Sequence, residues 1–307
     1  GFLYGMTASA TFGLLPLFTL PTMAEGMTTD SILCYRMLFA SLLVAVLMMV
    51  RRVNFSVGVR ELSWLVLLGF FYYGSATLLF QAYGSMSSGM ATTLHFLYPV
   101  GVTLIMAVLF KQRPSPFTII AIILALSGVA LLSLRGSGGA EGSASLVGIL
   151  LVLLSGLSYA IYLVTVNNVR RIREMNNLKL TLYVLLSSAG FFLINASFNG
   201  GVQAIPSGSA LVNLLLLAFL PTLVSNLALV RAIKSIGSTL TSVLGAMEPL
   251  TAIVIGVVVF SETISGTMAL GILLIIAAVT IIVLSPLLDK NIAERLHRFA
   301  QRPIGRR

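Results

Sequence analysis

The sequence predicts an all-α integral membrane protein of ten transmembrane helices, built as two inverted five-helix repeats with both termini in the cytoplasm. Three observations lead to this fold class: an extreme apolar composition, ten apolar stretches of membrane length, and a one-sided distribution of basic residues. Of the 307 residues, 58% are apolar and 9% are charged, and the mean hydropathy is +1.03. Soluble domains are about 45–50% apolar and about 25% charged. Lipid as the solvent explains the apolar excess.

Ten stretches reach the ~20 mostly apolar residues that a helix needs to cross the hydrocarbon core. Their predicted bounds are Phe2–Leu20, Ser31–Val50, Leu62–Tyr83, Gly89–Phe110, Pro116–Leu134, Ser145–Asn167, Leu178–Phe198, Ala210–Arg231, Ser238–Phe260 and Ile264–Leu287. The connections between them are short. The runs do not alternate with the two-residue period of a transmembrane β-strand, so they predict helices throughout.

The Lys and Arg residues indicate the orientation. Of the 19 basic residues, 17 lie in the even-numbered connections or in the C-terminal tail, while Arg135 is alone in the odd-numbered ones. The positive-inside rule then places the even-numbered connections and both termini in the cytoplasm. The net charge of +10 follows from this topology and predicts no nucleic-acid partner, because the basic residues do not gather on one solvated face. The tail, 289–307, is expected to lie against anionic lipid or to act as a solvated anchor.

The chain contains an internal repeat. At an offset of 150 residues the fourth span aligns with the ninth, so that Leu94 meets Leu244 and Pro99 meets Pro249. We expect a first repeat over 1–140 and a second over 141–288. Five helices per repeat is an odd number, so the second repeat crosses the membrane in the opposite sense. Inverted repeats are common in secondary transporters, where they allow alternating access to a central site. A channel built by duplication is the alternative.

Two segments carry a family resemblance. They are Leu97-Tyr-Pro-Val-Gly-Val-Thr-Leu, running on to Phe110, and Met247-Glu-Pro-Leu-Thr-Ala-Ile-Val, running on to Phe260-Ser-Glu-Thr. With these segments the chain resembles the EamA-type members of the drug/metabolite transporter superfamily. Arg36 resembles the second-span Arg of that family, whereas Gln112 stands where its turn Glu, kept as Glu262, is expected. The resemblance implies a ten-helix fold and export of amino acids or similar amphipathic metabolites.

Polar groups inside the spans are the candidates for substrate binding, because a charge at mid-helix costs about 2.5–3.5 kcal/mol and therefore faces a cavity or a partner. His95 could bind a substrate carboxylate or relay protons, or it could be packed and bonded to a neighbouring helix. Glu248 precedes Pro249 near the middle of the ninth span, where a kink exposes backbone. It could receive an ammonium group or a proton, or join two helices. Arg36 is expected to snorkel or to bond another helix rather than to bind ligand.

Further candidates offer hydroxyl, amide and aromatic groups. Three recur every four residues on one face of the third span, Tyr83 ends the same span, and the others lie in spans one, four, six and eight. Together with His95 and Glu248, the predicted substrate-binding set contains Thr11, Tyr73, Thr77, Gln81, Tyr83, Tyr98, Tyr159, Tyr162 and Asn226. Such a wall suits an apolar or aromatic solute with a polar head. Each member also has a structural reading, as an interface anchor or an interhelical bond. We expect Pro16, Pro99, Pro221 and Pro249 to act as kinks.

The predicted function is a secondary transporter of small neutral or zwitterionic metabolites, with export of amino acids foremost. Transport of a drug-like cation, a nucleotide sugar or a sugar phosphate, and a small-solute channel, are the alternatives. An enzyme is not expected, because paired acids, His clusters and a Gly-x-Ser-x-Gly elbow are missing from the sequence. We expect no cofactor and no metal site, since Cys34 is the single cysteine. The expected partners are a small-molecule substrate and the lipid bilayer, the expected assembly is a monomer, and the expected location is the bacterial inner membrane.

Overall fold

The structure is a computed structural model of the chain, and it describes residues 1–82, 94–112, 114–133, 146–248, 250, 251, 254, 258, 266, 267, 269–281 and 284. Every regular element in this described part is a helix. Six helical stretches there are long and apolar enough to cross a membrane, and shorter apolar helices accompany them. The sequence prediction of an all-α membrane protein is therefore confirmed.

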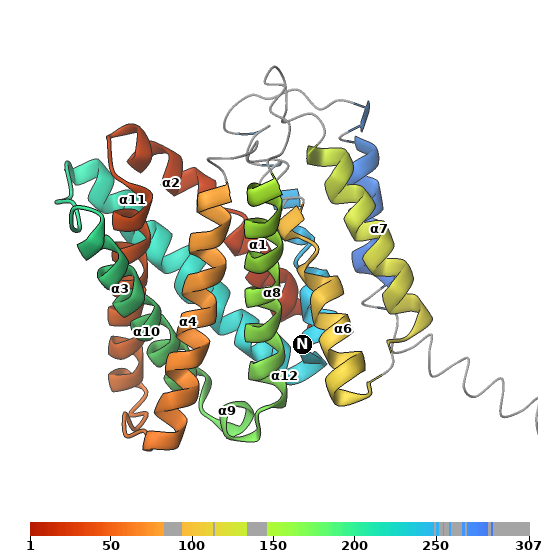
Figure 1. Cartoon of the computed structure of the whole chain (residues 1–307), viewed down its shortest axis with the longest axis horizontal. Helices are drawn as coiled ribbons and strands as arrows, with labels where there is room; N and C mark the ends of the chain where they lie inside the picture. The colour runs from red at the N-terminus through yellow and green to blue at the C-terminus, as the bar shows by residue number, and fades with distance from the viewer. Residues whose placement is uncertain are drawn as a thin grey trace, which may run out of the picture.

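The helices follow one another with short connections. Their bounds are α1 (Phe2–Phe12), α2 (Leu15–Ala24), α3 (Thr29–Val50), α4 (Val59–Ala82), α6 (Tyr98–Phe110), α7 (Pro116–Ser133), α8 (Leu146–Asn168), α9 (Arg170–Glu174), α10 (Asn177–Phe198), α11 (Gly208–Ala218), the π-helix η1 (Phe219–Val224) and α12 (Ser225–Leu244). The residues 269–281 form a further helix that lies beside α7 (Figure 1).

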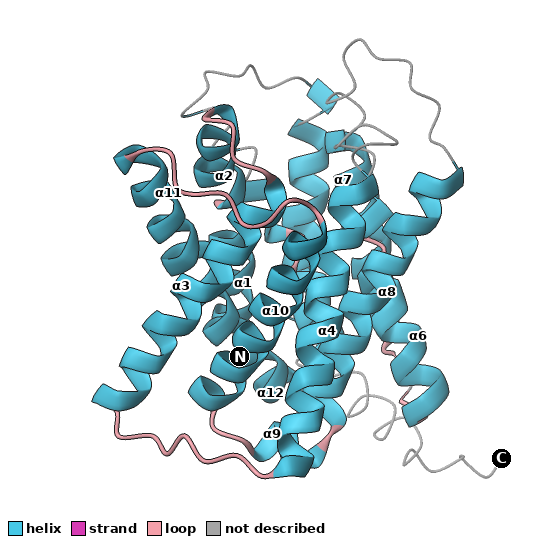
Figure 2. Cartoon of the chain, turned by 60° about the vertical axis from the view of Figure 1, so that its left-hand side comes forward, coloured by secondary structure: helices cyan, strands magenta, loops and turns pink. Residues whose placement is uncertain are grey.

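The long helices stand side by side in one bundle. The helix α4 packs against α8 and α10, α3 packs against α10, and α1 packs against α12 (Figure 1). The loop 51–58 and the short helix α9 lie at one end of the bundle, which we call the basic end because Arg51, Arg52, Lys111 and Arg173 are there (Figure 2). The loop 199–207 crosses the opposite end (Figure 2).

Three apolar stretches contain breaks that hydropathy did not predict. The first span is interrupted at Gly13 and Leu14, which join α1 to α2. A turn at Phe96 and Leu97 precedes α6, and Gly245 and Ala246 form the equivalent turn, within one residue of the offset that relates the two repeats. Hydropathy averages over whole spans, so it does not detect a break of two apolar residues. The matching turns agree with the internal repeat.

The eighth and ninth predicted spans are not separated by a loop. Residues 232–236 continue the helix α12, and the chain turns at Gly237, whose φ is +85°. Only glycine adopts this conformation readily, so this residue ends one helical segment and Ser238 begins the next. Arg231 and Lys234 therefore lie on the helix rather than in a connection.

Polar contacts fasten the end of the bundle opposite the basic end. Ser207 caps α11 by accepting a hydrogen bond from the Ala210 amide, as helix N-caps commonly do. The Ser207 and Ser209 hydroxyls also donate to the Glu25 carboxylate, and these bonds lower the pKa of Glu25. The Gln203 side chain accepts from the Thr28 amide. These bonds tie the α2–α3 turn to the start of α11.

Small residues set the distance between packed helices. A Cβ at Gly5 would overlap the Leu244 side chain, and a Cβ at Gly13 would overlap the Glu248 carbonyl, so α1 lies very close to the second repeat. A Cβ at Gly69 would overlap Ser187 and approach the Val184 carbonyl, so α4 and α10 are equally close. Close approach at small residues is the usual way in which membrane helices pack.

Replacing Gly69 by alanine is expected to destabilise the bundle. The added methyl group meets main-chain and Cβ atoms that cannot rotate away, and overpacking of this kind costs about 1–3 kcal/mol. The matched control is Gly190→Ala on the partner helix α10, where nothing lies within 4 Å of the added Cβ. Thermal unfolding in detergent should show a lowered midpoint for Gly69→Ala and an unchanged or raised one for Gly190→Ala. Equal midpoints would contradict the packing of α4 on α10.

Candidate functional site

A buried arginine and a π-helix occupy the middle of the bundle. Pro221 has no amide N–H to donate, so the carbonyl of Leu217 accepts instead from the Thr222 hydroxyl, at 2.8 Å. The Thr222 oxygen in turn accepts from Nε of Arg36, at 2.6 Å. A second guanidinium nitrogen lies 3.4 Å from the Pro221 carbonyl. The proline therefore widens the helix into a π-turn, and the turn receives the arginine.

Arg36 is 3% exposed, so it does not snorkel, and the helix-to-helix bond is the alternative that the structure supports. Its guanidinium carbon lies 5.2 Å from the centroid of the Phe12 ring. Within the described residues no carboxylate forms an ion pair with it, and Glu248 lies farther away, on the cavity that Phe12 also lines. Polar bonds, an aromatic face and a more distant carboxylate together accommodate the buried cation.

The same π-turn orients a polar side chain toward the centre. Asn226 donates to the Thr222 carbonyl at 2.8 Å and to the Tyr72 hydroxyl at 3.3 Å. Ser225, its neighbour, donates to the Ala8 carbonyl at 2.8 Å and so joins α12 to α1. Buried polar groups need such partners. The result is a fixed amide between α4 and α12.

A small cavity of about 20 Å³ lies at this point, between α1, α4, α8 and α12. This is room for about one water molecule. Four of the predicted candidates line it: Tyr98, Tyr159, Asn226 and Glu248. Ser225, next to Asn226 in the sequence, lines it too, and the structure adds polar and aromatic lining residues that the sequence reasoning missed, namely Ser9, Phe12, Tyr72, Thr241 and Ser242.

Several aromatic rings pack together at the cavity and behind its wall. The ring of Tyr98 lies 4.9 Å from that of Tyr159, and Tyr159 stacks on Tyr162 at 6.0 Å. The imidazole of His95 lies 5.7 Å from the Tyr98 ring. Its Nδ1 is 3.0 Å from the Ser155 hydroxyl. Because that hydroxyl donates to the Ser75 carbonyl, its oxygen is left to accept a hydrogen bond from the N–H at Nδ1 of His95.

The other candidates lie away from this cavity. Tyr73 packs between Phe191 and Phe192 of α10, and Gln81 is exposed. The buried hydroxyl of Thr77 has no partner in the described part of the chain. Thr11 bonds the carbonyls of its own helix. Tyr162 is buried behind the lining residues, and His95 also lies behind them. Tyr83 lies outside the described residues.

The third span shows why the sequence missed Tyr72. The four-residue spacing of Tyr73, Thr77 and Gln81 marks one face, but this face turns toward α10. The neighbouring face carries Tyr72 and Ser75, and Ser75 contacts Ser155 of α8. Both faces have similar polarity, so the spacing alone could not choose between them.

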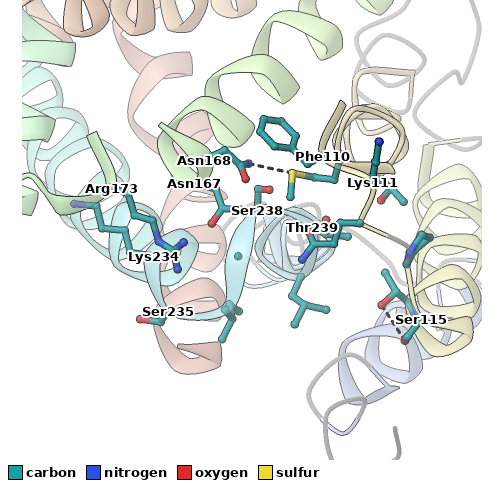
Figure 3. A pocket seen from close by; sticks show the side chains of 18 residues that line it. Phe110, Lys111, Ser115, Asn167, Asn168, Arg173, Lys234, Ser235, Ser238 and Thr239 are labelled. Atoms are coloured by element: carbon teal, nitrogen blue, oxygen red, sulfur yellow. Dashed lines mark hydrogen bonds between the residues drawn. The ribbon is translucent and has the colours of Figure 1, made fainter. Parts of the chain in front are cut away.

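A second, larger hollow opens at the basic end. It measures about 840 Å³ and is bounded by α6, the start of α7, the end of α8, α9 and the Gly237 turn of α12 (Figure 3). Its wall is one helical turn from the central cavity, since Asn167 of the hollow and Leu163 of the cavity are four residues apart on α8. A turn of helix rises about 5.4 Å.

Apolar helices of membrane length around a polar central cavity define a multi-pass membrane protein. The profile described as "EamA-like transporter family" matches residues 1–134 and, a second time, residues 146–284. The chain therefore belongs to the EamA-like transporter family, in two repeats, and is a membrane transporter of small solutes.

One solved structure, titled "Crystal structure of protein", is similar to this chain with a TM-score of 0.79 and 19% sequence identity. The alignment covers 94% of this chain and 97% of that chain. At this identity the likeness shows the fold alone. No curated protein matches the chain.

The Thr222 hydroxyl is expected to be essential for holding Arg36. Thr222→Val leaves the Leu217 carbonyl and Nε of Arg36 without this partner, and an unpaired buried group costs about 1–3 kcal/mol, more when charged. Thr22→Val is the matched control, because Thr22 is equally buried and bonds only the Phe18 carbonyl of its own helix. Thermal unfolding in detergent measures both. A Thr222→Val midpoint no lower than that of Thr22→Val would contradict the role given to this bond.

Proposed function

We propose that the protein is a secondary transporter of neutral or zwitterionic metabolites, and that amino acids with large apolar or aromatic side chains are its main substrates. The observation that carries this proposal is one carboxylate, Glu248, on a cavity lined by Tyr72, Tyr98 and Tyr159. A carboxylate suits an ammonium group, and tyrosine rings suit an apolar side chain while their hydroxyls bind polar atoms.

The charges around the cavity favour a zwitterion. Glu248 lines the cavity, and Arg36 lies behind Phe12, which also lines it. The opposite charges of Arg36 and Glu248 therefore bias the two ends of a solute in opposite directions. A sugar phosphate or nucleotide sugar needs several cationic groups around it, and the described residues that line the cavity include no Lys or Arg.

Alternating access is the mechanism that we propose. The turn at Phe96–Leu97 belongs to the first repeat and lies against α8, where the His95 carbonyl is close to Gly156. The equivalent turn at Gly245–Ala246 belongs to the second repeat and lies close to the first, where a Cβ at Gly245 would overlap the Tyr98 hydroxyl. Each repeat thus rests on the other at a helix break. The central cavity of about 20 Å³ is too small for an amino acid, so binding requires these contacts to separate.

Flux measurements test the substrate class. Purified protein in proteoliposomes should take up labelled phenylalanine and leucine with saturation. Imposed proton and sodium gradients would show whether the flux is coupled. Saturable flux of an organic cation or a sugar phosphate with none of an amino acid would overturn the substrate class. Flux that does not saturate would favour a channel.

Removing the cavity carboxylate is expected to weaken recognition of an ammonium group. Glu248→Gln should lower kcat/KM for phenylalanine at least about tenfold, because the loss of one buried charge partner costs about 2 kcal/mol or more. Flux of 3-phenylpropionate, which lacks the amine, should fall much less. Glu174→Gln, an exposed carboxylate paired with Arg170, is the control with unchanged flux. An equal loss for both solutes would contradict the assignment.

The orientation can be tested by labelling cysteines. Cys34 is fully buried, so a membrane-impermeant maleimide should not label the protein that carries no introduced cysteine. We expect the basic end to face the cytoplasm. Ala204→Cys, in the exposed loop at the opposite end, should be labelled in intact bacterial cells. Ser56→Cys, at the basic end, should be labelled only after the cells are permeabilised. The reverse pattern would contradict the orientation.

A further inference from the structure

The hollow at the basic end has the charge and size of a binding site. It measures about 840 Å³, within the range of about 300–1,000 Å³ that small-molecule sites show. Lys111, Arg173 and Lys234 line it, and its described lining residues include no Asp or Glu. Figure 3 shows Arg173 and Lys234 on one side of the hollow and Lys111 on the other.

Two of these cations are unpaired. Lys111 and Arg173 are exposed and form no ion pair with a described carboxylate. Lys234 donates to the Met175 carbonyl at 2.6 Å and to Oδ1 of Asn177 at 2.8 Å, so it fixes α12 to the turn before α10. A hollow lined by one sign of charge concentrates ions of the opposite sign.

Uncharged donors lie between the cations. Asn167 and Asn168 contribute to the wall, and Ser238 is fully buried with a hydroxyl that has no partner in the described part of the chain. Buried hydroxyls are nearly always bonded. A hydroxyl without a partner in the wall of a basic hollow is therefore a group that a ligand could satisfy.

The positive-inside rule does not account for this arrangement. The rule requires basic residues at the cytoplasmic end and does not require that they surround a hollow. Arg51, Arg52 and Arg171 satisfy it at the same end without lining the hollow. The grouping of Lys111, Arg173 and Lys234 around one space comes from α6, α9 and α12, which are distant in the sequence.

We propose that this hollow is an anion-binding site that takes the carboxylate of the solute before the solute enters the central cavity. The proposal rests on the proposed transport function and adds a second site to it. The hollow adjoins the cavity through one turn of α8, so a solute held there by its carboxylate has its ammonium group and side chain free to reach Glu248 and the tyrosines.

Two pairs of variants isolate the site. Lys111 occupies the left-handed region with φ of 54°, and so does Arg52, with φ of 52°. Asparagine tolerates this conformation, so Lys111→Asn and Arg52→Asn change the same charge without straining the backbone. Arg173→Gln and Arg171→Gln do the same on the short helix α9. The double variant of the hollow, which we call the vestibule variant, combines Lys111→Asn with Arg173→Gln. The control variant combines Arg52→Asn with Arg171→Gln.

Binding is measured on the full-length protein in detergent, without transport. The probe is benzoate at constant ionic strength, with benzamide as its neutral counterpart, and the readout is the thermal unfolding midpoint against probe concentration. We expect benzoate to stabilise the native chain and the control variant, benzamide to do so much less, and the vestibule variant to need about tenfold more benzoate. Equal responses to the two probes, or equal losses in the two variants, would overturn the anion site.

A transport assay and a competition assay with a lipid show whether the anion that binds is the solute or a lipid headgroup. With solute supplied from the basic end of proteoliposomes, the vestibule variant should raise the half-saturating amino-acid concentration while the control variant does not. Displacement of benzoate by short-chain phosphatidylglycerol and not by amino acids would assign the site to lipid headgroups and overturn the proposal. Benzoate binding that depends on the vestibule charges, in a protein that moves no amino acid, would overturn the proposed substrate class and the solute route while leaving an anion site.

Discussion

The accommodation of one guanidinium at membrane depth organises the centre of this protein. Arg36 is buried and forms no ion pair with a described carboxylate, so its charge needs strong acceptors from a neighbouring helix. Pro221 supplies them by releasing a carbonyl and widening the helix, and Thr222 joins the released carbonyl to the arginine. The same turn directs Asn226 toward Tyr72 and the cavity. A backbone irregularity that is costly in lipid is tolerated because each freed group finds a partner inside the bundle.

The two helix breaks give the bundle its central contact. Each repeat places a turn of two apolar residues against the other repeat, and glycines at Gly13, Gly156 and Gly245 allow main chains and the Tyr98 hydroxyl to approach closely. Such contacts involve little side-chain interlocking, so they can separate and reform without large repacking. A contracted centre of about 20 Å³ beside a hollow of about 840 Å³ is consistent with one stage of such a cycle. The two spaces have different lining groups: cations line the hollow at the basic end, and tyrosines with one carboxyl group line the central cavity.

Much of the architecture was predictable because it depends on properties that are local in the chain. Apolar runs of membrane length predicted the helices, and the profile match in two parts confirms the repeat and the family. Tyr98, Tyr159, Asn226 and Glu248 were expected in a cavity and line one. Their signal was a polar or aromatic group next to a proline or deep within an apolar run. Tyr72 was missed because its face and that of Tyr73 are equally polar, and only the packing of α4 on α8 decides which faces the centre.

By itself the sequence determined that the chain lies in a membrane and that it consists of two related repeats, and it predicted that most basic residues lie at one end, as those in the described connections do. These conclusions follow from the free energy of placing each side chain in lipid or water, which needs no knowledge of neighbours. The tertiary structure alone decided the partner of Arg36, the break at Gly237, the lining of the cavity and the grouping of Lys111, Arg173 and Lys234. The bond from Arg36 to Thr222 joins residues 186 positions apart, and such pairings depend on how the helices rotate and pack against one another, which the hydropathy of each helix leaves undetermined.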